Sequence, residues 1–404
     1  MLTYDEALER VLNVAGGPLP KERVALAAAR GRALARDVTA AEDLPPFDNS
    51  SVDGYAFRSE DLRPFSPGVV LPVSQVIPAG ATRITPLAPG TAARIFTGAP
   101  VPPGADAVVM QEDTENPGGD TGQVLLRDAG SAAYIRRAGS DVARGTVALT
   151  AGTTLDAGAV GLLAALNVTD APCTRVPRVA LLTTGDEVIP PGSAPLAPGQ
   201  IRDANGPALA AAVAEAGAEL AVREHAADTE ASVRAALAAC QGCDVIVSSG
   251  GVSVGDHDHV KAVAEEMGVL HFWRIAIKPG KPLAFGRVGG ALFFGLPGNP
   301  VSSLVTFELF VRPVLRRLAG HAQVLRPRTV ALLTADLPHA PGRREFVRAR
   351  VEWRAEDGAC LATPTGAQGS HRLASLVGAN ALLVAHEDRG DYAAGESLPA
   401  LLLS

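Results

Sequence analysis

The chain has 404 residues, of which 47% are hydrophobic and 20% are charged, so it is long enough for about two to four domains with their own cores. Its net charge of −7 argues against a nucleic-acid-binding protein, because such proteins need a basic stripe that replaces counterions on phosphate. No apolar run approaches the ~20 residues of a membrane span, and the N-terminus lacks the features of a secretory signal, so we expect a cytoplasmic protein without a membrane partner.

The four cysteines do not predict a metal or redox site. Only Cys240 and Cys243 form a CxxC motif, and no second pair supplies the other half of a zinc site. A thioredoxin-like pair would stand at a helix N-terminus, whereas this pair follows the helix-like segment Val233–Ala239. We therefore expect inert thiols.

The first part of the chain is predicted to be helical and then rich in β-strands. Residues Tyr4–Leu8 and Glu22–Ala35 carry apolar residues at three- and four-residue spacing, which predicts helices. From residue 45 to 141, short β-rich runs alternate with Gly/Pro turns, which is typical of a small all-β domain. Helical character returns at Ala157–Leu166, so residues 45–141 are interpreted as an insertion into a helical domain of residues 1–44 and 142–176. The predicted β runs are Val69–Val76, Ala93–Thr97, Ala107–Met110 and Gln123–Leu126.

Residues 177–325 predict an α/β domain, because strand-like and helix-like segments alternate there. This pattern indicates a doubly wound, mostly parallel sheet with helices on both faces. Asn205 and Asn299 are expected to cap the helices that begin beside them. The expected strands are Val179–Leu182, Leu220–Glu224, Asp244–Val247, Phe272–Ile277 and Leu292–Phe294, and the expected helices begin near Asn205 and Asp228 or span His259–Met267 and Val301–Leu318.

Residues 326–404 show only β runs, at Thr329–Thr334, Glu345–Val351 and Ala381–Ala385. They predict a small C-terminal β-barrel or sandwich. The whole chain is thus predicted to have a multidomain fold of the α/β plus β class.

The loop Thr183–Glu187 is the first candidate site. In an open parallel sheet, ligands bind at the carboxyl ends of the strands, and this loop directly follows a strand that is expected to be buried. Its adjacent carboxylates, Asp186 and Glu187, are suited to a magnesium ion that bridges phosphates. A tight turn with solvated acids explains the loop equally well.

The segment Ser248–His259 is a second candidate, because its small residues allow backbone amides to approach a phosphate. It has neither the Lys-Ser/Thr of a Walker loop nor the GxGxxG of a dinucleotide site. As metal ligands, the acids Asp256 and Asp258 are favoured over the two histidines, since no third histidine is nearby.

Two Pro-Gly segments form the third candidate. Lys278 and Lys281 lie on a stiff turn, where they can offer point charges to phosphate or an oxyanion. The free amides of the helix that begins at Asn299-Pro300 form another anion site. A structural turn and an ordinary cap would explain each segment alone, but three features suited to anions in one domain favour binding.

Two further polar segments lie in the predicted insertion. The turn Asp48–Ala56 is dense in polar residues, although Asx-turns explain that composition equally well. Arg136–Asp141 places two guanidinium groups beside a carboxylate, and a surface ion pair is the commoner role for such a run.

These segments together resemble the molybdopterin molybdotransferases, the bacterial MoeA proteins, to which the C-terminal part of gephyrin is similar. The resemblance covers nearly the whole chain, in order. The motifs that carry it are Pro46–Ala56, Phe96–Pro100, Arg136–Asp141, Thr184–Glu187, Ser249–Gly255, Ala276–Pro282 and Leu296–Pro300.

The resemblance implies a four-part subunit and a homodimer, with the site where the α/β domain meets the partner's β insertion. Carried over motif by motif, the catalytic candidates are Asp53, Glu187, Asp228, Asp258 and Lys278, and the metal candidates are Asp186, Glu187 and Asp258. The substrate-binding candidates are Thr97, Arg136, Asp141, Thr184, Gly185, Ser249, Gly250, Gly251, Arg274, Lys281, Pro297, Gly298, Asn299, Arg348 and Ser370. Arg274 stands where some members have lysine.

The family reaction takes adenylylated molybdopterin and molybdate and releases AMP, with the metal bound by the dithiolene of the substrate. Magnesium is the implied cofactor, and transient contacts with other cofactor-biosynthesis enzymes are compatible with this role. No residue resembles a nucleophile, so catalysis is expected to consist of positioning and electrostatics. The alternatives are the adenylyltransferase of the same pathway, whose single domain resembles residues 178–320, and a gephyrin-like scaffold without catalysis.

Overall fold

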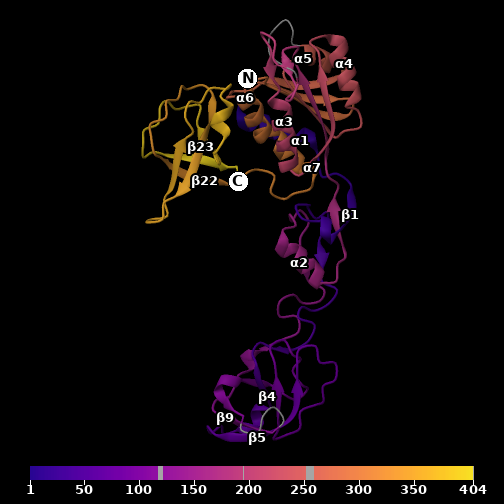
Figure 1. The fold of residues 1–404 in the computed structure, drawn as a ribbon, viewed down its shortest axis with the longest axis vertical. Coiled ribbons are helices and arrows are strands. Elements are labelled where there is room, and N and C mark those ends of the chain that lie inside the picture. Colours follow the sequence, from indigo (N-terminus) through magenta and orange to yellow (C-terminus); the bar gives the residue numbers. More distant parts are fainter. Residues whose placement is uncertain (117–121, 194, 252–258, 404) are drawn as a thin grey trace. The chain divides into compact units, whose positions relative to one another are not determined.

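The computed structural model describes residues 1–116, 122–193, 195–251 and 259–403 (Figure 1). The chain divides into two compact units. Unit 1 comprises Met1–Arg36, Ala151–Asp156 and Asp170–Ser404, and unit 2 comprises Asp37–Thr150 and Ala157–Thr169. The four-part division expected from the sequence stays a prediction.

The centre of unit 1 is a six-stranded, mostly parallel sheet with the order β16-β13-β17-β21-β20-β18. The first four strands in this order run parallel, and β20 and β18 are antiparallel to their neighbours. Their bounds are Arg178–Thr184 for β13, Glu219–Ala226 for β16, Val245–Ser249 for β17, Gly268–Arg274 for β18, Pro282–Val288 for β20 and Ala291–Leu296 for β21. The carboxyl ends of the parallel strands therefore meet at one edge, and the predicted α/β class is confirmed.

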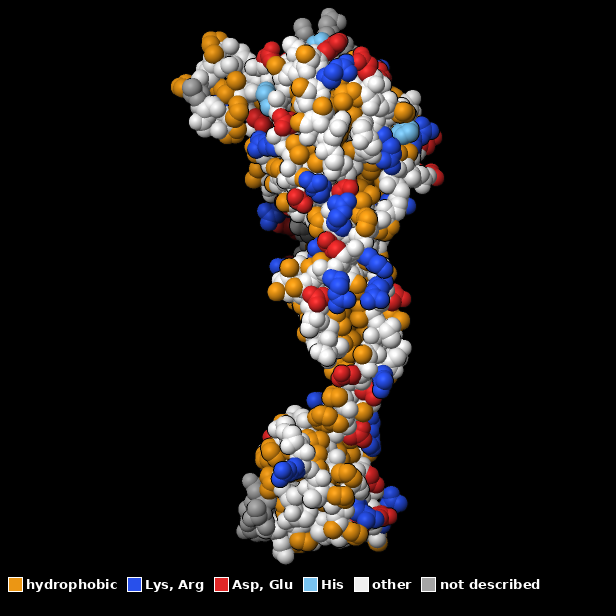
Figure 2. Space-filling model, turned by 90° about the vertical axis from the view of Figure 1, so that its right-hand side faces the viewer, with side chains coloured by type: hydrophobic (Ala, Val, Ile, Leu, Met, Phe, Trp, Pro, Cys, Tyr) orange, Lys and Arg blue, Asp and Glu red, His pale blue; other side chains and the backbone are white. Residues whose placement is uncertain are grey.

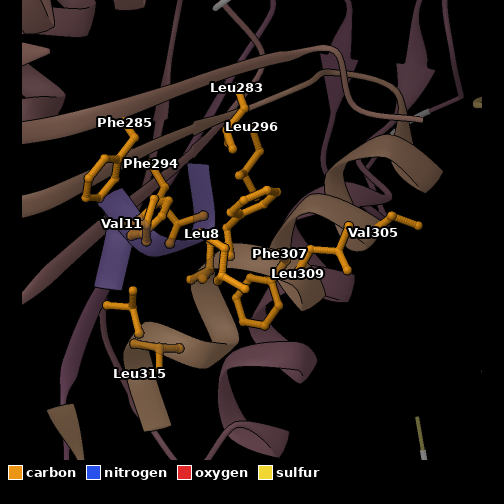
Figure 3. Packing of buried hydrophobic residues seen from close by; sticks show 14 of the residues in the cluster. Leu8, Val11, Leu283, Phe285, Phe294, Leu296, Val305, Phe307, Leu309 and Leu315 are labelled. Carbon is orange, nitrogen blue, oxygen red and sulfur yellow. The ribbon is translucent and has the colours of Figure 1, made fainter. Parts of the chain in front are cut away.

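Helices cover both faces of this sheet (Figure 1), because successive residues of each central strand point to opposite faces. Leu181 and Val247 face the cluster that includes helices α1, α3, α6 and α7, while Leu182 and Ile246 face α4 and α5. Figure 3 shows Leu8 of α1 within the first of these cores. The helices are α1 (Tyr4–Ala15), α3 (Asn205–Glu215), α4 (Glu230–Ala239), α5 (His259–Met267), α6 (Pro300–Thr306) and α7 (Arg312–Leu318), with a π-helix over Phe307–Val311 between the last two.

The C-terminal part of unit 1 is a closed five-stranded barrel. Its strands follow the order β23-β24-β22-β26-β25, and β25 pairs again with β23, which closes the sheet. The short strand β19 (Ile277–Lys278) of the α/β part also pairs with β23. The barrel strands are β22 (Arg328–Leu333), β23 (Arg344–Trp353), β24 (Cys360–Pro364), β25 (Ala381–Ala385) and β26 (Ser397–Leu402). The barrel alternative for residues 326–404 is confirmed.

Unit 2 is built around a β-sheet with the order β7-β4-β6-β5-β9-β8, together with the two-stranded pairs β10-β3 and β11-β2. Its one described α-helix is α2 (Ala157–Ala165), where a helix was predicted. The strands are β2 (Val38–Thr39), β3 (Asn49–Ser50), β4 (Gly54–Phe57), β5 (Val69–Ile77), β6 (Ala92–Ile95), β7 (Ala107–Met110), β8 (Thr114–Glu115), β9 (Gln123–Leu126), β10 (Ile135–Arg136) and β11 (Val147–Leu149). The four β runs predicted here are confirmed.

Two local predictions were wrong. Residues 22–35 do not form a helix: β1 (Lys21–Ala25) pairs antiparallel with β12 (Asp170–Thr174), and a 3-10 turn over Leu26–Ala28 follows. The apolar spacing of residues 22–35 is compatible with a helix, but strand pairing with the distant segment β12 decides the structure. Asn205 does not cap α3 either, because the N–H of Gly206 donates instead to the carboxylate of Asp203, at 2.8 Å.

The surface mixes charges of both signs, and the cysteines of the CxxC motif are buried. On the face that Figure 2 shows, basic and acidic side chains lie among one another. No helix among the described residues is long and apolar enough to cross a membrane. Cys240 and Cys243 are buried free thiols, and burial raises the pKa of Cys240 to about 12, which disfavours the reactive thiolate.

Candidate functional site

A cavity of about 600 Å³ lies at the edge where the parallel strands of unit 1 end. The loops after β13, β16, β17 and β21 all contribute to its wall. Ten of the predicted site residues line it: Thr184, Gly185, Glu187, Asp228, Ser249, Gly250, Gly251, Pro297, Gly298 and Asn299. The position agrees with the general rule for ligands of open α/β sheets.

The loop after β13 turns at a glycine that allows no side chain. Gly185 has φ of +127°, and a Cβ on it would lie 2.7 Å from Oε2 of Glu187. Glu187 itself lines the cavity. Asp186 and Asp228 bind each other's backbone, since each carboxylate accepts the other residue's N–H at 3.2 Å. This exchange holds the loops after β13 and β16 together and places three carboxylates at one edge.

The loop after β17 approaches this turn closely. Gly250 and Gly251 have φ of +96° and +67°, in the left-handed region that favours glycine. A Cβ on Gly250 would lie 2.8 Å from Oγ1 of Thr184, and one on Gly251 would lie 2.5 Å from a methyl group of Val260. At both positions the backbone lies where a side chain would clash with Thr184 or Val260. Such exposed backbone can approach a phosphate closely.

Asn205, a predicted helix cap, instead joins two walls of the cavity. Its amide nitrogen donates to Oγ of Ser249 at 2.8 Å and to the carbonyl oxygen of Gly298 at 2.7 Å. The sequence shows a polar side chain at the start of α3. The residues around it in the sequence, however, do not reveal whether it caps the helix or joins two distant loops.

Helix α6 begins at the wall of the cavity. Pro300 is its first residue, and Asn299 precedes it as the N-cap without a hydrogen bond from its side chain to the helix. Both residues line the cavity. The first turn of a helix carries amides without intrahelical partners, and together with the helix dipole they favour an anion.

The predicted basic residues of this region lie outside the cavity wall. Lys278 forms an ion pair with Glu345 of the barrel at 3.0 Å. The guanidinium of Arg274 lies 4.7 Å from the ring centroid of Trp273. Lys281 is exposed, and its carbonyl oxygen accepts the N–H of Ile275.

The barrel supplies one residue to the cavity, His371, which sequence reasoning missed. Its neighbour Ser370 accepts the N–H of Val301 through its carbonyl oxygen, at 3.1 Å. Arg348 is fully buried in the barrel, where it donates to Oγ of Ser375 at 3.1 Å, and burial lowers its pKa. Arg348 therefore lies inside the barrel, whereas His371, which follows Ser370 in the chain, lines the cavity.

The predicted site residues of unit 2 form hydrogen bonds within that unit. Asp53 accepts the N–H of Thr97 at 2.7 Å and its hydroxyl at 2.9 Å, and these two bonds lower the pKa of Asp53. Arg136 pairs through β10 with Asn49 of β3. The backbone N–H of Asp141 donates to the carbonyl oxygen of Leu44 at 3.0 Å.

The donor set at the cavity fits a magnesium ion bound together with phosphate. Glu187 and Asp228 line the wall, Asp186 adjoins them, and Mg²⁺ takes one or two carboxylates plus substrate phosphates in such sites. Within the described ranges, no group of three His, Cys, Asp or Glu side chains is close enough to hold a metal by itself. Asp258, the third predicted ligand, lies outside the described residues.

Three stretches of the chain match known family regions. Residues 2–167 match the MoeA N-terminal region (domain I and II), residues 180–317 match a probable molybdopterin binding domain, and residues 330–403 match the MoeA C-terminal region (domain IV).

Whole-length relatives agree with these matches. Molybdopterin molybdenumtransferase 2 of Mycobacterium tuberculosis is 42% identical over 384 residues, which are 93% of each chain. Gephyrin of Dictyostelium discoideum is 33% identical over 448 residues, covering all of this chain and 62% of gephyrin. The crystal structure of the molybdopterin biosynthesis moeA protein from Pyrococcus horikoshii OT3 superposes with a TM-score of 0.85 at 30% identity, over 100% of both chains.

Proposed function

Because this chain belongs to the MoeA family of molybdopterin molybdenumtransferases, we propose that it inserts molybdenum into molybdopterin during molybdenum cofactor biosynthesis. The observation that supports this most directly is the cavity of about 600 Å³ at the carboxyl edge of the sheet. Its wall combines closely approaching glycines, carboxylates and a helix N-terminus, which suits a substrate that carries phosphate.

In the proposed reaction, adenylylated molybdopterin and molybdate bind at this cavity, AMP is released and molybdenum remains on the dithiolene of the substrate. Gly251 and Ser302, in the first turn of α6, bind phosphate through backbone amides, and Gly250, whose N–H donates to the carbonyl oxygen of Leu296, allows the close approach. The turn of Gly185 keeps the carboxylate of Glu187 at the wall. The dithiolene sulfurs belong to the substrate, so the protein contributes position and electrostatic stabilisation instead of a nucleophile.

Magnesium is part of this proposal. The ion would be held by Glu187 and Asp186, with Asp228 beside them and Asp258 as a further ligand, and it would supply positive charge against the phosphate oxygens. The paired loops of Asp186 and Asp228 support the proposal, because they fix these carboxylates before any ion binds.

We further propose that the protein is a cytoplasmic homodimer. Asp53, Thr97, Arg136 and Asp141 belong to unit 2, and the family resemblance assigns them to the site of the partner subunit. Light scattering of the purified protein would give twice the mass of one chain, whereas a fully active monomer would contradict the proposed dimer.

The transfer itself is tested by incubating the purified protein with adenylylated molybdopterin, magnesium and molybdate. We expect AMP and the finished cofactor in equal amounts, and neither product without the protein. Release of AMP without cofactor would contradict molybdenum transfer. Formation of adenylylated molybdopterin from molybdopterin and ATP would instead support the adenylyltransferase alternative.

A further inference from the structure

Glu345 is a buried carboxylate that faces two basic side chains where the barrel meets the α/β part of unit 1. Its side chain is 4% exposed. Nζ of Lys278 lies 3.0 Å from one of its oxygens and 3.1 Å from the other, and Nδ1 of His339 lies 3.0 Å from Oε2. Lys278 is 45% exposed, so this network begins inside the barrel and ends at an accessible ammonium group.

Backbone pairing fixes the register of this contact but not the position of the ammonium. Strand β19 runs parallel to β23, with Lys278 opposite Glu345, and the N–H of Arg344 donates to the carbonyl oxygen of Ala276 at 3.1 Å. A lysine side chain is a point charge on a flexible four-carbon stem, so the backbone alone leaves it free to turn. The carboxylate at its tip removes that freedom.

His339 in turn holds Glu345. Its ring is 1% exposed, and Nε2 lies 2.9 Å from the carbonyl oxygen of His386, while Nδ1 faces the carboxylate. The backbone N–H of His339 donates to the carboxylate of Asp391 at 2.7 Å, and its ring lies beside that of Tyr392. Since both ring nitrogens have partners, neither the imidazole nor the carboxylate can rotate without leaving a buried polar atom unpaired, which costs free energy.

We propose that Glu345, held by His339, is a positioning residue for Lys278. It fixes the ammonium group in one place, so that Lys278 presents its charge to an anionic substrate without first losing side-chain freedom. The claim that Lys278 presents its charge to the substrate is the functional half of this inference, and it rests on the proposed function. The claim that Glu345 fixes the ammonium group is the positioning half, and it concerns the protein alone. The barrel then contributes to transfer by controlling a lysine of the neighbouring α/β part.

The positioning of Lys278 is tested by labelling lysines of the full chain with acetic anhydride, read by mass spectrometry. In Glu345→Gln the ammonium of Lys278 loses its anionic partner and the constraint on its position, so we expect Lys278 to label about threefold to tenfold faster. Lys281 should label as in the wild type. The matched control is Glu352→Gln, an exposed acid of the same strand that pairs with Arg350.

Unchanged labelling of Lys278 in Glu345→Gln would overturn the proposal. If that variant fails to fold, His339→Gln examines the same contact from the other side and should also speed the labelling of Lys278. Labelling of Lys278 at the wild-type rate in a folded His339→Gln variant would then overturn it.

The functional half is tested by a double-mutant cycle on the transfer rate. We expect Glu345→Gln to lower kcat on the order of tenfold in the wild type and to have no further effect beside Lys278→Ala. The same tenfold loss in both backgrounds would show that Glu345 acts elsewhere. Wild-type turnover of Lys278→Ala would contradict the role of Lys278 in the proposed function, and the labelling result would still decide the positioning.

Discussion

The carboxyl edge of unit 1 and the polar turn of unit 2 have similar compositions but different environments. At the edge, Glu187 lines a cavity together with glycine backbone. In unit 2, the carboxylate of Asp53 accepts two hydrogen bonds from Thr97, and that of Asp48 accepts one from the N–H of Ala138 at 2.8 Å. A dense polar segment is therefore a better candidate for ligand binding where its groups surround a space than where the chain already satisfies them.

The largest effect that would sharpen this comparison is expected at Glu187. Glu187→Gln removes one negative charge from the wall of the cavity with little change of shape, so we expect kcat for the proposed transfer to fall roughly a hundredfold. The melting temperature should stay the same. Glu356→Gln, an exposed residue of the barrel, is the matched control. Wild-type turnover of Glu187→Gln at every magnesium concentration would show that this loop has no metal role.

A smaller effect is expected from filling the space between the two glycine turns. Gly250→Ala places a methyl group 2.8 Å from Oγ1 of Thr184 at a residue with φ of +96°. We expect a loss of stability of roughly 2–3 kcal/mol and weaker substrate binding. Gly199→Ala is the matched control, because Gly199 has φ of +85° and no atom within 4 Å of the added Cβ.

In Gly199→Ala, the strain of a left-handed backbone conformation alone should lower the free energy of unfolding by about 1 kcal/mol and leave substrate binding unchanged. Urea unfolding and a binding titration of both variants separate strain from contact. Equal losses of stability and affinity in the two variants would mean that the approach of Gly250 to Thr184 has no special role.

The lysines of the Pro-Gly turn should give a moderate effect. Lys278 and Lys281 lie outside the cavity wall, but Pro282 of the same turn lines it, so replacing either lysine by alanine removes a positive charge close to the proposed anion site. We therefore expect affinity for the substrate to fall about tenfold to a hundredfold. Binding by the wild type should also weaken more with added salt than binding by either variant. Unchanged affinity in both variants would show that the lysines do not bind the anion, and would leave only the glycine loop and the N-terminus of α6 as anion-binding groups.

The smallest effect is expected in unit 2 and depends on pH. The bonds from Thr97 lower the pKa of Asp53 in the folded state, so their stabilisation is present above the unfolded pKa of about 3.9 and disappears as the pH falls through the folded value. Thermal melts should show the wild type slightly more stable than Asp53→Asn at pH 6, with the difference shrinking as the pH falls below the unfolded pKa. A difference that stays constant over that range would mean that the carboxylate charge is not what stabilises this turn.

The sequence predicted strands and motifs well where the signal was local. The runs at Ala107–Met110 and Ala381–Ala385 and the helix His259–Met267 match the structure residue for residue. Strand β20 was missed because it begins with a proline and contains a glycine, Gly286, beside β18. The helix predicted at residues 22–35 was wrong because β1 pairs with a segment far along the chain.

The sequence predicts the loops that line the site, but not the side-chain contacts that join those loops to one another. Strand ends and glycines pointed to the cavity, since the topology of a parallel sheet brings such loops together. Asn205 and His371 could not be foreseen, because one joins loops from different strands and the other comes from the barrel. The pairing of Lys278 with Glu345 likewise depends on β19 meeting β23.

The central claim is that the loops at the carboxyl edge of unit 1 bind the substrate. Amide hydrogen exchange with and without adenylylated molybdopterin, followed residue by residue, tests it most directly. We expect slower exchange in residues 184–187, 249–251 and 301–303, which form or adjoin the wall of the cavity, and no change at the exposed turn of Gly358 in the barrel. Unchanged exchange in all three loops, in protein that is saturated with substrate, would contradict the account.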